Sequence, residues 1–253
     1  MALERLGASG WIAALVLGLL QGTAPPAWSD TDSAAKESGS HPDADVDRAA
    51  ITGDACRQRA IRAVQHRYEG IRDLRARFLQ TTRVAAIGSR ASEPTISHGN
   101  VVVSKPSRMR WSYEAPEPSL VVSDGKTLWI YDPGFGEVQR LPADGTFLSG
   151  AALQFLLGRG DMEREFAVRL VSCEAMAVEL ELTPREPTSY EKLYILADPG
   201  TGDVSRTRID DLLGNTTVVE FSELKVNLDP PADLFRFDPP AGVRIIDLAE
   251  PAR

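Results

Sequence analysis

The sequence is poor in the residue types from which metal sites and many catalytic sites are built. Its 253 residues include two cysteines and three scattered histidines, His41, His66 and His98. This spacing matches no zinc-ligand pattern. A phosphate-binding glycine loop is lacking, because Gly158-Arg-Gly160 has neither the required spacing nor a following helix, and there is no Gly-x-Ser-x-Gly motif. We therefore expect no metal, no cofactor and no enzymatic activity.

Basic residues are also in the minority, which argues against a general nucleic-acid-binding protein. The chain has 28 lysines and arginines against 36 aspartates and glutamates, a formal net charge of −8. Domains that bind nucleic acid usually carry a strong basic patch. The arginines of one predicted helix are accordingly interpreted as its solvated side; they are Arg57, Arg59, Arg62 and Arg67.

The N-terminal segment contains no apolar run long enough for a membrane-spanning helix. Its apolar stretch, Trp11–Leu20, is about half the length that a bilayer requires. Small residues at Ala27 and Ser29 follow at signal-peptidase spacing, so residues 1–29 are predicted to be a cleaved signal peptide, with a retained membrane anchor as the alternative. Residues 30–50 are acidic and almost free of apolar side chains, which predicts a disordered tether before a folded domain at residues 51–253.

The two cysteines, Cys56 and Cys173, both fall in this predicted mature chain. In an oxidising compartment an even pair is compatible with one disulfide. Two separately buried thiols are the other interpretation, since unpaired cysteine is itself among the most buried residue types.

The spacing of apolar residues changes from helical to strand-like after Gly70. Ile61, Val64 and Tyr68 predict an amphipathic helix from Asp54 to about Glu69. Alternating apolar residues then predict roughly ten strands separated by turn residues. They begin at Leu74 and continue as 100–104, 108–113, 120–123, 127–131, 165–172, 177–183, 192–198, 204–210 and 216–226. One more helix is predicted at 149–157. Many strands with few helices favour one large curled antiparallel sheet.

The concave side of such a sheet has to be filled by side chains, a helix or a ligand. Large apolar residues at Phe78, Met109, Trp111 and Leu120 are candidates for that side. The alternative is that they form an ordinary hydrophobic core, because apolar stripes usually do.

Residues 105–133 resemble the LolA family of outer-membrane lipoprotein carriers. The similarity lies in Lys105-Pro106, the strand that contains Trp111, and the hairpin Val122-Ser-Asp-Gly-Lys-Thr-Leu-Trp129. Three other stretches agree with the family pattern: Ala76–Gln80, the apolar helix Leu153–Leu157 before Gly158, and Leu234–Val243.

The resemblance implies a mainly β (α+β) fold. This is an incomplete, strongly curved antiparallel β-barrel around a hydrophobic cavity, covered by an N-terminal helix and a short lid helix. The positions implied for acyl-chain binding in the cavity are Phe78, Met109, Trp111, Leu120 and Val122. Those implied for the lid are Leu153, Phe155, Leu156 and Leu157.

One position departs from the family pattern. The family has an arginine before the proline, where it fastens the lid by hydrogen bonds, and this chain has Lys105. Lysine keeps the charge but loses the planar fork of donors. The lid latch is therefore expected to be weaker, or to use Arg108 or Arg110. The alternative is that Lys105 is a solvated charge at a strand end.

By resemblance, the protein is a monomeric periplasmic carrier for acylated lipoproteins. Its implied partners are the inner-membrane ABC extractor LolCDE and, if the host has one, the outer-membrane receptor LolB; no nucleic acid is expected. Two alternatives remain. One is a paralogue of the same fold that carries another lipid. The other is an RseB-like lipoprotein-sensing regulator, although such proteins carry a second domain for which the chain leaves no room.

Overall fold

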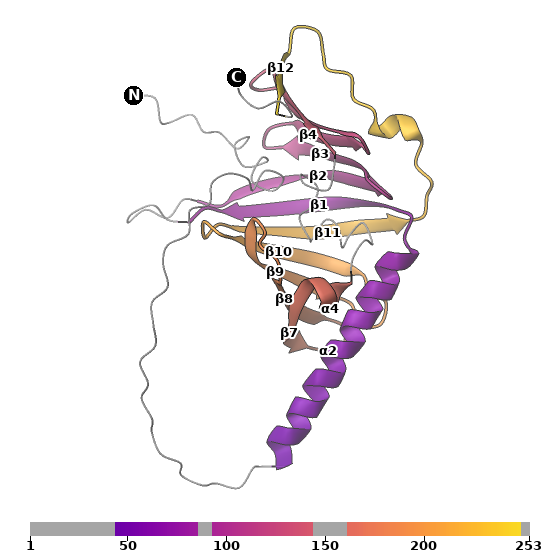
Figure 1. Cartoon of the computed structure of the whole chain (residues 1–253), viewed down its shortest axis with the longest axis vertical. Coiled ribbons are helices and arrows are strands. Elements are labelled where there is room, and N and C mark those ends of the chain that lie inside the picture. The colour runs from indigo at the N-terminus through magenta and orange to yellow at the C-terminus, as the bar shows by residue number, and fades with distance from the viewer. Residues whose placement is uncertain (1–43, 86–92, 144–160, 249–253) are drawn as a thin grey trace.

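The computed structural model describes residues 44–85, 93–143 and 161–248, and β-strands predominate among them (Figure 1). The helical elements are α2 (Ala44–Gly70), α4 (Met162–Glu165) and the 3₁₀ turn η1 (Ala232–Phe235). The strands of this part of the chain are β1 (Asp73–Arg83), β2 (Thr95–Ser104), β3 (Arg108–Ala115), β4 (Ser119–Asp124), β5 (Thr127–Asp132), β6 (Glu137–Pro142), β7 (Phe166–Cys173), β8 (Val178–Pro184), β9 (Tyr190–Ala197), β10 (Val204–Asp211), β11 (Thr216–Val226) and β12 (Arg244–Asp247).

These twelve strands form one sheet in the order β12-β6-β5-β4-β3-β2-β1-β11-β10-β9-β8-β7. Strand β1 joins two antiparallel runs, since it pairs with β2 on one side and with β11 on the other. The pairing of β12 with β6 is parallel. Because β12 and β7 end the order without pairing with each other, the sheet is open. The prediction of one large, mainly antiparallel sheet is confirmed.

The ten strands predicted from alternation are all present, and two more were not predicted. Strand β6 escaped notice because its buried residues, Val138 and Leu141, are separated by two polar residues and so do not alternate. Strand β12 has four residues and pairs with β6 alone, a contact that its own sequence does not indicate. The helix predicted at 149–157 lies outside the described residues, as does the predicted signal peptide.

Each strand alternates between two sides, and the register aligns the buried positions of neighbouring strands. Phe78 of β1 stands opposite Gly99 of β2, which stands opposite Tyr113 of β3. Directly opposed residues share one side of a sheet. We call this side the helix-side face, because its buried residues and those of α2 form one hydrophobic core. The other side is called the back face.

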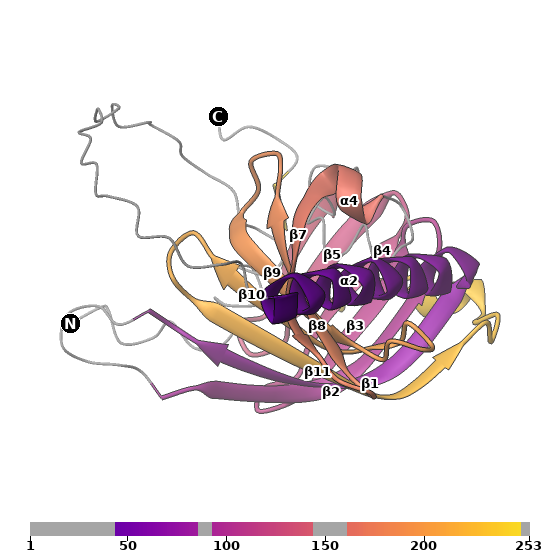
Figure 2. The same cartoon turned by 90° about the horizontal axis from the view of Figure 1, so that it is seen from below.

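Helix α2 buries the stripe predicted for it, with Ile61, Val64 and Tyr68 in the core. It crosses nearest the viewer in Figure 2. The helix begins at Ala44 rather than near Asp54, so residues 44–50 of the segment assigned to the tether are helical. Among the described residues, no helix is both long and apolar enough to cross a membrane.

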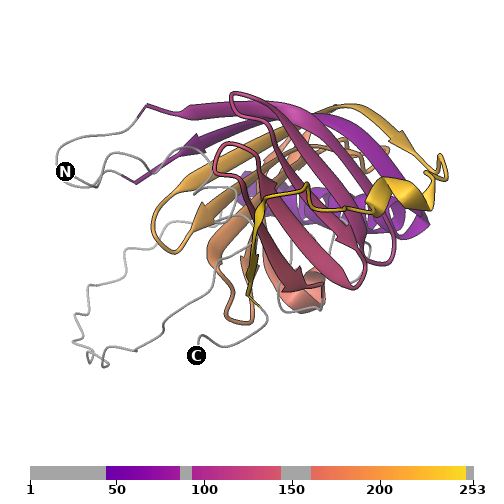
Figure 3. The same ribbon diagram turned by 90° about the horizontal axis from the view of Figure 1, so that it is seen from above.

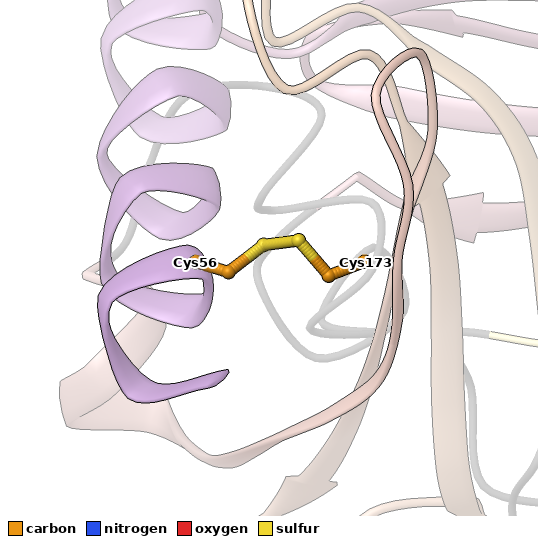
Figure 4. The surroundings of a disulfide bond; sticks show 2 residues. All are labelled: Cys56 and Cys173. Atoms are coloured by element: carbon orange, nitrogen blue, oxygen red, sulfur yellow. A yellow bond between two sulfur atoms is a disulfide. The ribbon is translucent and has the colours of Figure 1, made fainter. Parts of the chain in front are cut away.

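A disulfide between Cys56 and Cys173 joins α2 to the end of β7 (Figure 4). Of the two interpretations that the sequence allowed, the bonded one holds. The bond closes a loop with a sequence separation of 117 residues and ties the helix to an edge strand of the sheet. A disulfide is consistent with an extracytoplasmic location, since cytosolic thiols are kept reduced.

The back face of β3 to β5 is covered by the segment around η1, which lies towards the viewer in Figure 3. Arg110 donates to the carbonyl oxygen of Leu234 at 3.2 Å, and the Arg108 guanidinium lies 5.2 Å from the centre of the Phe235 ring. The Phe237 ring lies 5.9 Å from that of Trp129. The C-terminal segment thus shields one side of these strands, while α2 belongs to the other.

Candidate functional site

Four aromatic residues gather on the helix-side face where β3, β1 and β11 meet. The ring of Phe78 lies 4.8 Å from that of Trp111 and 5.0 Å from that of Tyr113, and Phe221 lies 6.4 Å from Trp111. Tilted and edge-on arrangements at these distances are the favourable ones for aromatic pairs. The cluster therefore forms a rigid apolar patch at the centre of the sheet.

Gly99 makes room for this cluster. A Cβ atom on Gly99 would stand 1.9 Å from the Ser112 carbonyl oxygen and 3.1 Å from the Phe78 ring. Any larger residue would therefore displace both the neighbouring strand and the ring. A bare glycine between Phe78 and Tyr113 lets their rings meet across β2.

Part of this face remains incompletely buried. Phe78 and Met109 are 3 % and 5 % exposed, whereas Trp111, Phe221 and Ile209 are only partly buried against the same core. The other partly buried residues packed on this core are Val168, Leu170, Leu224 and Val226. Half-buried apolar side chains that adjoin a core are the kind of surface that an apolar ligand can cover.

The register corrects the prediction of a single cavity wall. Met109 and Trp111 pair with Ser123 and Val121, so these residues share the helix-side face with Phe78. Leu120 and Val122 pair with Ser112 and Arg110 and point to the back face. Val122 is 0 % exposed on the side that the η1 segment covers. The prediction that Leu120 and Val122 line the same wall as Met109 and Trp111 is wrong.

Residues that were not predicted take their place. Val121 and Ile130 stand opposite each other on β4 and β5, buried on the helix-side face beside Trp111. Phe221 comes from β11, which pairs with β1 only after the chain has passed through β7 to β10. Its alternation within 216–226 signals a strand, but not its proximity to Trp111.

One end of the helix-side face carries polar residues. The Tyr113 hydroxyl donates to Gln80 Oε1 at 2.9 Å, and Gln80 Nε2 donates to Thr82 Oγ1 at 3.3 Å. Burial raises the pKa of Tyr113, while the contacts with Gln80 and Trp111 lower it less. The phenol therefore stays protonated and acts as a hydrogen-bond donor at physiological pH.

Lys105 lies between β2 and β3 at the opposite end of the strands. Its ammonium donates to the carbonyl oxygen of Tyr68 in the last turn of α2. Burial lowers the pKa of Lys105, and the nearby Glu69 carboxylate opposes that shift. A cation at this position satisfies an end carbonyl and suits the helix dipole. Lys105 is thus not a free solvated charge.

The two arginines considered as substitutes for Lys105 serve the back face. Arg108 donates to Ser104 Oγ at 2.9 Å and lies over Phe235, and Arg110 binds the Leu234 carbonyl. The predicted lid, with Leu153, Phe155, Leu156 and Leu157, lies outside the described residues. Whether Lys105 fastens it stays a prediction.

Within the described ranges, no group of three or more His, Cys, Asp or Glu side chains is placed to hold a metal ion. The feature that stands out instead is an apolar face, part buried under a helix and part half-exposed. Fold and site together define a class of protein: a single open β-sheet that offers an apolar surface for binding.

Comparison with known proteins identifies the family. The model described as outer membrane lipoprotein carrier protein LolA matches residues 69–238. An outer-membrane lipoprotein carrier protein of Dechloromonas aromatica is 33% identical over 176 residues, covering 69% of this chain and 81% of the relative. A carrier of the same description from Nitrosospira multiformis is 33% identical over 178 residues, covering 70% and 84%. A solved LolA superfamily protein from Nitrosomonas europaea has a TM-score of 0.40 and 14% identity, covering 72% of this chain and 97% of that one.

The chain belongs to the LolA family of outer-membrane lipoprotein carrier proteins, which are non-enzymatic transport proteins. The matched segment runs from the end of α2 to just beyond η1, so it contains β1 to β11 and all the aromatic residues described above.

Proposed function

We propose that the chain carries lipoproteins to the outer membrane by binding their acyl chains on the helix-side face. The observation that supports this most is the half-buried aromatic patch around Trp111 and Phe221, which lies within the family match. Each methylene group that leaves water for such a surface contributes about 0.8 kcal/mol. Long acyl chains would therefore bind without any charged or catalytic group.

The acyl chains need a concave surface, and we propose that the sheet curves around the helix-side face to form one. An open sheet of this length twists, since neighbouring strands rotate by about 20°. Phe78, Met109 and Trp111 would form the floor of the cavity, with Val121 and Ile130 beside them. Leu120 and Val122 are left out of it, because they point to the back face.

Release of the cargo is the harder step, because burial of several acyl chains is very favourable. We propose that the segment with Leu153, Phe155, Leu156 and Leu157 acts as a lid that competes for the cavity. A competitor lowers the net affinity by the free energy of its own contacts, and transfer then proceeds to a receptor with a better apolar site. Lys105 would influence the lid at the end of the face where it holds α2.

The periplasm is the compartment in which such a carrier would work, and the Cys56–Cys173 disulfide fits an oxidising location. The donor of the cargo would be the inner-membrane extractor LolCDE and the acceptor LolB. We propose these two partners by analogy with the family alone.

A substitution pair tests the site. Phe221→Glu places a charge on the helix-side face, whereas Ile96→Glu places the same charge on the back face, where Ile96 is 58 % exposed. We expect Phe221→Glu to lower the affinity for a fluorescent acyl probe at least about tenfold, because a buried carboxylate is strongly unfavourable there. Ile96→Glu should bind as the unsubstituted protein does.

The measurement is a fluorescence titration, with circular dichroism to verify that both variants fold. Equal binding by the two variants would place the ligand elsewhere. Mass spectrometry of lipid co-purified from the periplasm then identifies the cargo. An acylated peptide supports lipoprotein carriage, and a free phospholipid would indicate a paralogue that carries another lipid.

A further inference from the structure

The polar end of the helix-side face contains a buried hydroxyl that the fold itself leaves without a partner. Ser119 is 7 % exposed, and its Oγ atom makes no hydrogen bond. It stands directly opposite Tyr113 across β3 and β4, so it shares that residue's face. Buried polar atoms are rarely left unpaired, because the loss of water is then uncompensated. The Ser119 hydroxyl therefore calls for a partner that the chain does not supply.

A second donor lies diagonally across from it. The indole Nε1 of Trp111 is also buried without a hydrogen bond of normal geometry, although it approaches the Tyr113 oxygen closely enough to lower its pKa. Trp111 is two residues from Tyr113 on β3, and diagonal neighbours on paired strands lie about 7–8 Å apart. An acceptor between Trp111 and Ser119 would be within reach of both donors.

Ser123 shows that the strand can satisfy a serine where the chain alone is to be served. It lies on the same strand and the same face as Ser119, four residues further on. Its hydroxyl donates to the Ser107 carbonyl at 2.8 Å and accepts from the Gly125 amide at 3.2 Å. The unpaired state of Ser119 is thus a property of its end of the face, not of β4.

The apolar part of the face begins beside these donors. From Ser119 the helix-side positions of β4 run past Val121 to Ser123, opposite Tyr113, Trp111 and Met109 in turn. Four residues of strand span about 13 Å. A ligand whose polar group sits at Ser119 would therefore extend its chains over Trp111 towards Met109.

We propose that Ser119 and Trp111 donate hydrogen bonds to the carbonyl oxygen of an acyl ester, and so set where the polar end of the cargo stops. This rests on the proposed function, since it assumes that acyl chains bind this face. A carbonyl oxygen has two lone pairs and accepts both donors. The site would then recognise ester-linked chains in preference to equally long chains without a carbonyl.

Two lipopeptide probes separate the carbonyl from the chains. One is a cysteinyl-serine dipeptide whose cysteine sulfur carries a dipalmitoylglyceryl group, and the other is its dialkyl ether analogue with chains of the same length. We expect Ser119→Ala to weaken binding of the diester about tenfold, the equivalent of one charge-free hydrogen bond of 1.4 kcal/mol, and to change ether binding less than about twofold. Isothermal titration with the full mature chain measures both affinities.

Trp111→Phe is the second variant, because it keeps the aromatic ring and removes the N–H. It should lose affinity for the diester more than for the ether. Ser123→Ala is the matched control, expected to lower the unfolding temperature and to leave both affinities unchanged. Ser119→Ala should not lower that temperature, since it removes a hydroxyl that nothing satisfies.

The outcomes separate this proposal from the function on which it rests. If neither probe binds the unsubstituted protein, the proposed function fails. If both probes bind and Ser119→Ala and Trp111→Phe weaken them equally or not at all, acyl binding stands and the carbonyl site is wrong. A buried water at Ser119 would give that second result.

Discussion

Lys105 illustrates how one residue can keep a position in a family pattern while its contacts are set by the local structure. The ammonium binds the Tyr68 carbonyl in the last turn of α2, and the backbone N–H of Lys105 donates to the Arg72 carbonyl at 2.9 Å. Both contacts fasten the junction between α2 and β1 to the end of β2. The single charge of lysine suffices for one carbonyl, where a bidentate partner would require arginine.

Lys105→Met tests this contact. We expect the free energy of unfolding to fall by about 1 kcal/mol, because the Tyr68 carbonyl loses its partner and the helix end loses a cation. Urea denaturation measures the change, and Lys105→Arg, which keeps the charge, should recover most of it.

The rate of acyl-probe release from the same variants tests the lid. Faster release from Lys105→Met than from Ser123→Ala, a variant destabilised away from α2, would support a latch. Equal rates would restrict Lys105 to holding the helix.

At the scale of elements, the docking of α2 depends on close approach of the β9–β10 turn. Gly202 has a φ of +75°, and a Cβ atom there would stand 2.2 Å from the Ala63 carbonyl oxygen. Next to this contact, Arg67 Nε donates to Asp203 Oδ1 at 2.6 Å. The turn itself is held by Asp198 Oδ1, which accepts from the Gly200 and Thr201 amides. These bonds lower the pKa of Asp198.

Gly202→Ala should therefore push α2 away from the sheet. We expect a loss of about 3 kcal/mol in unfolding free energy, the sum of a left-handed backbone on alanine and a steric overlap with backbone. Thermal denaturation followed by circular dichroism gives the value. Gly200→Ala in the same turn is the control, since it meets only the Asp198 side chain at 3.3 Å and should cost less than about 1 kcal/mol. Equal losses from the two variants would show that α2 does not depend on this approach.

Across the whole molecule, the disulfide and the C-terminal segment hold opposite sides of one open sheet. Cys56–Cys173 attaches α2 to β7 at one edge, and β12 pairs with β6 at the other. An exposed edge strand invites pairing with another chain, and a covered edge avoids it. The long loop that the disulfide closes makes its effect on the unfolded chain large.

Replacing both cysteines by serine should lower the free energy of unfolding by about 2–5 kcal/mol, the range expected for a closed loop of this length. Guanidinium denaturation with and without a reductant measures it. Reductant should destabilise the unsubstituted protein to the same degree and leave the serine variant unaffected. An unchanged midpoint after verified reduction would mean that the helix holds its place without the bond.

Much of the architecture could be predicted from local patterns. The change from steps of three and four at Ile61, Val64 and Tyr68 to alternation from Leu74 onward located α2 and β1, because side-chain periodicity follows backbone geometry. Turn residues located the hairpins in the same way, as at Asp124-Gly125, where Gly125 adopts a φ of +96°. The family pattern in 105–133 then added what the strands serve.

Long-range register was beyond local patterns. Alternation puts Leu120 and Val122 on one side of β4, but their side relative to Met109 depends on how the turn after Tyr113 sets the pairing of β3 with β4. A shift of one residue would exchange Val121 and Val122. The Phe221–Trp111 contact likewise exists because β11 returns to pair with β1.

The sequence by itself determined that this protein is a mainly antiparallel β protein with one covering helix and belongs to the carrier family, because periodicity and motif are local properties of the chain. The tertiary structure decided which apolar residues share the helix-side face, that Cys56 meets Cys173, and that Ser119 is buried beside Trp111 without a partner. Those facts depend on strand register and helix docking, in which residues far apart in the chain become neighbours.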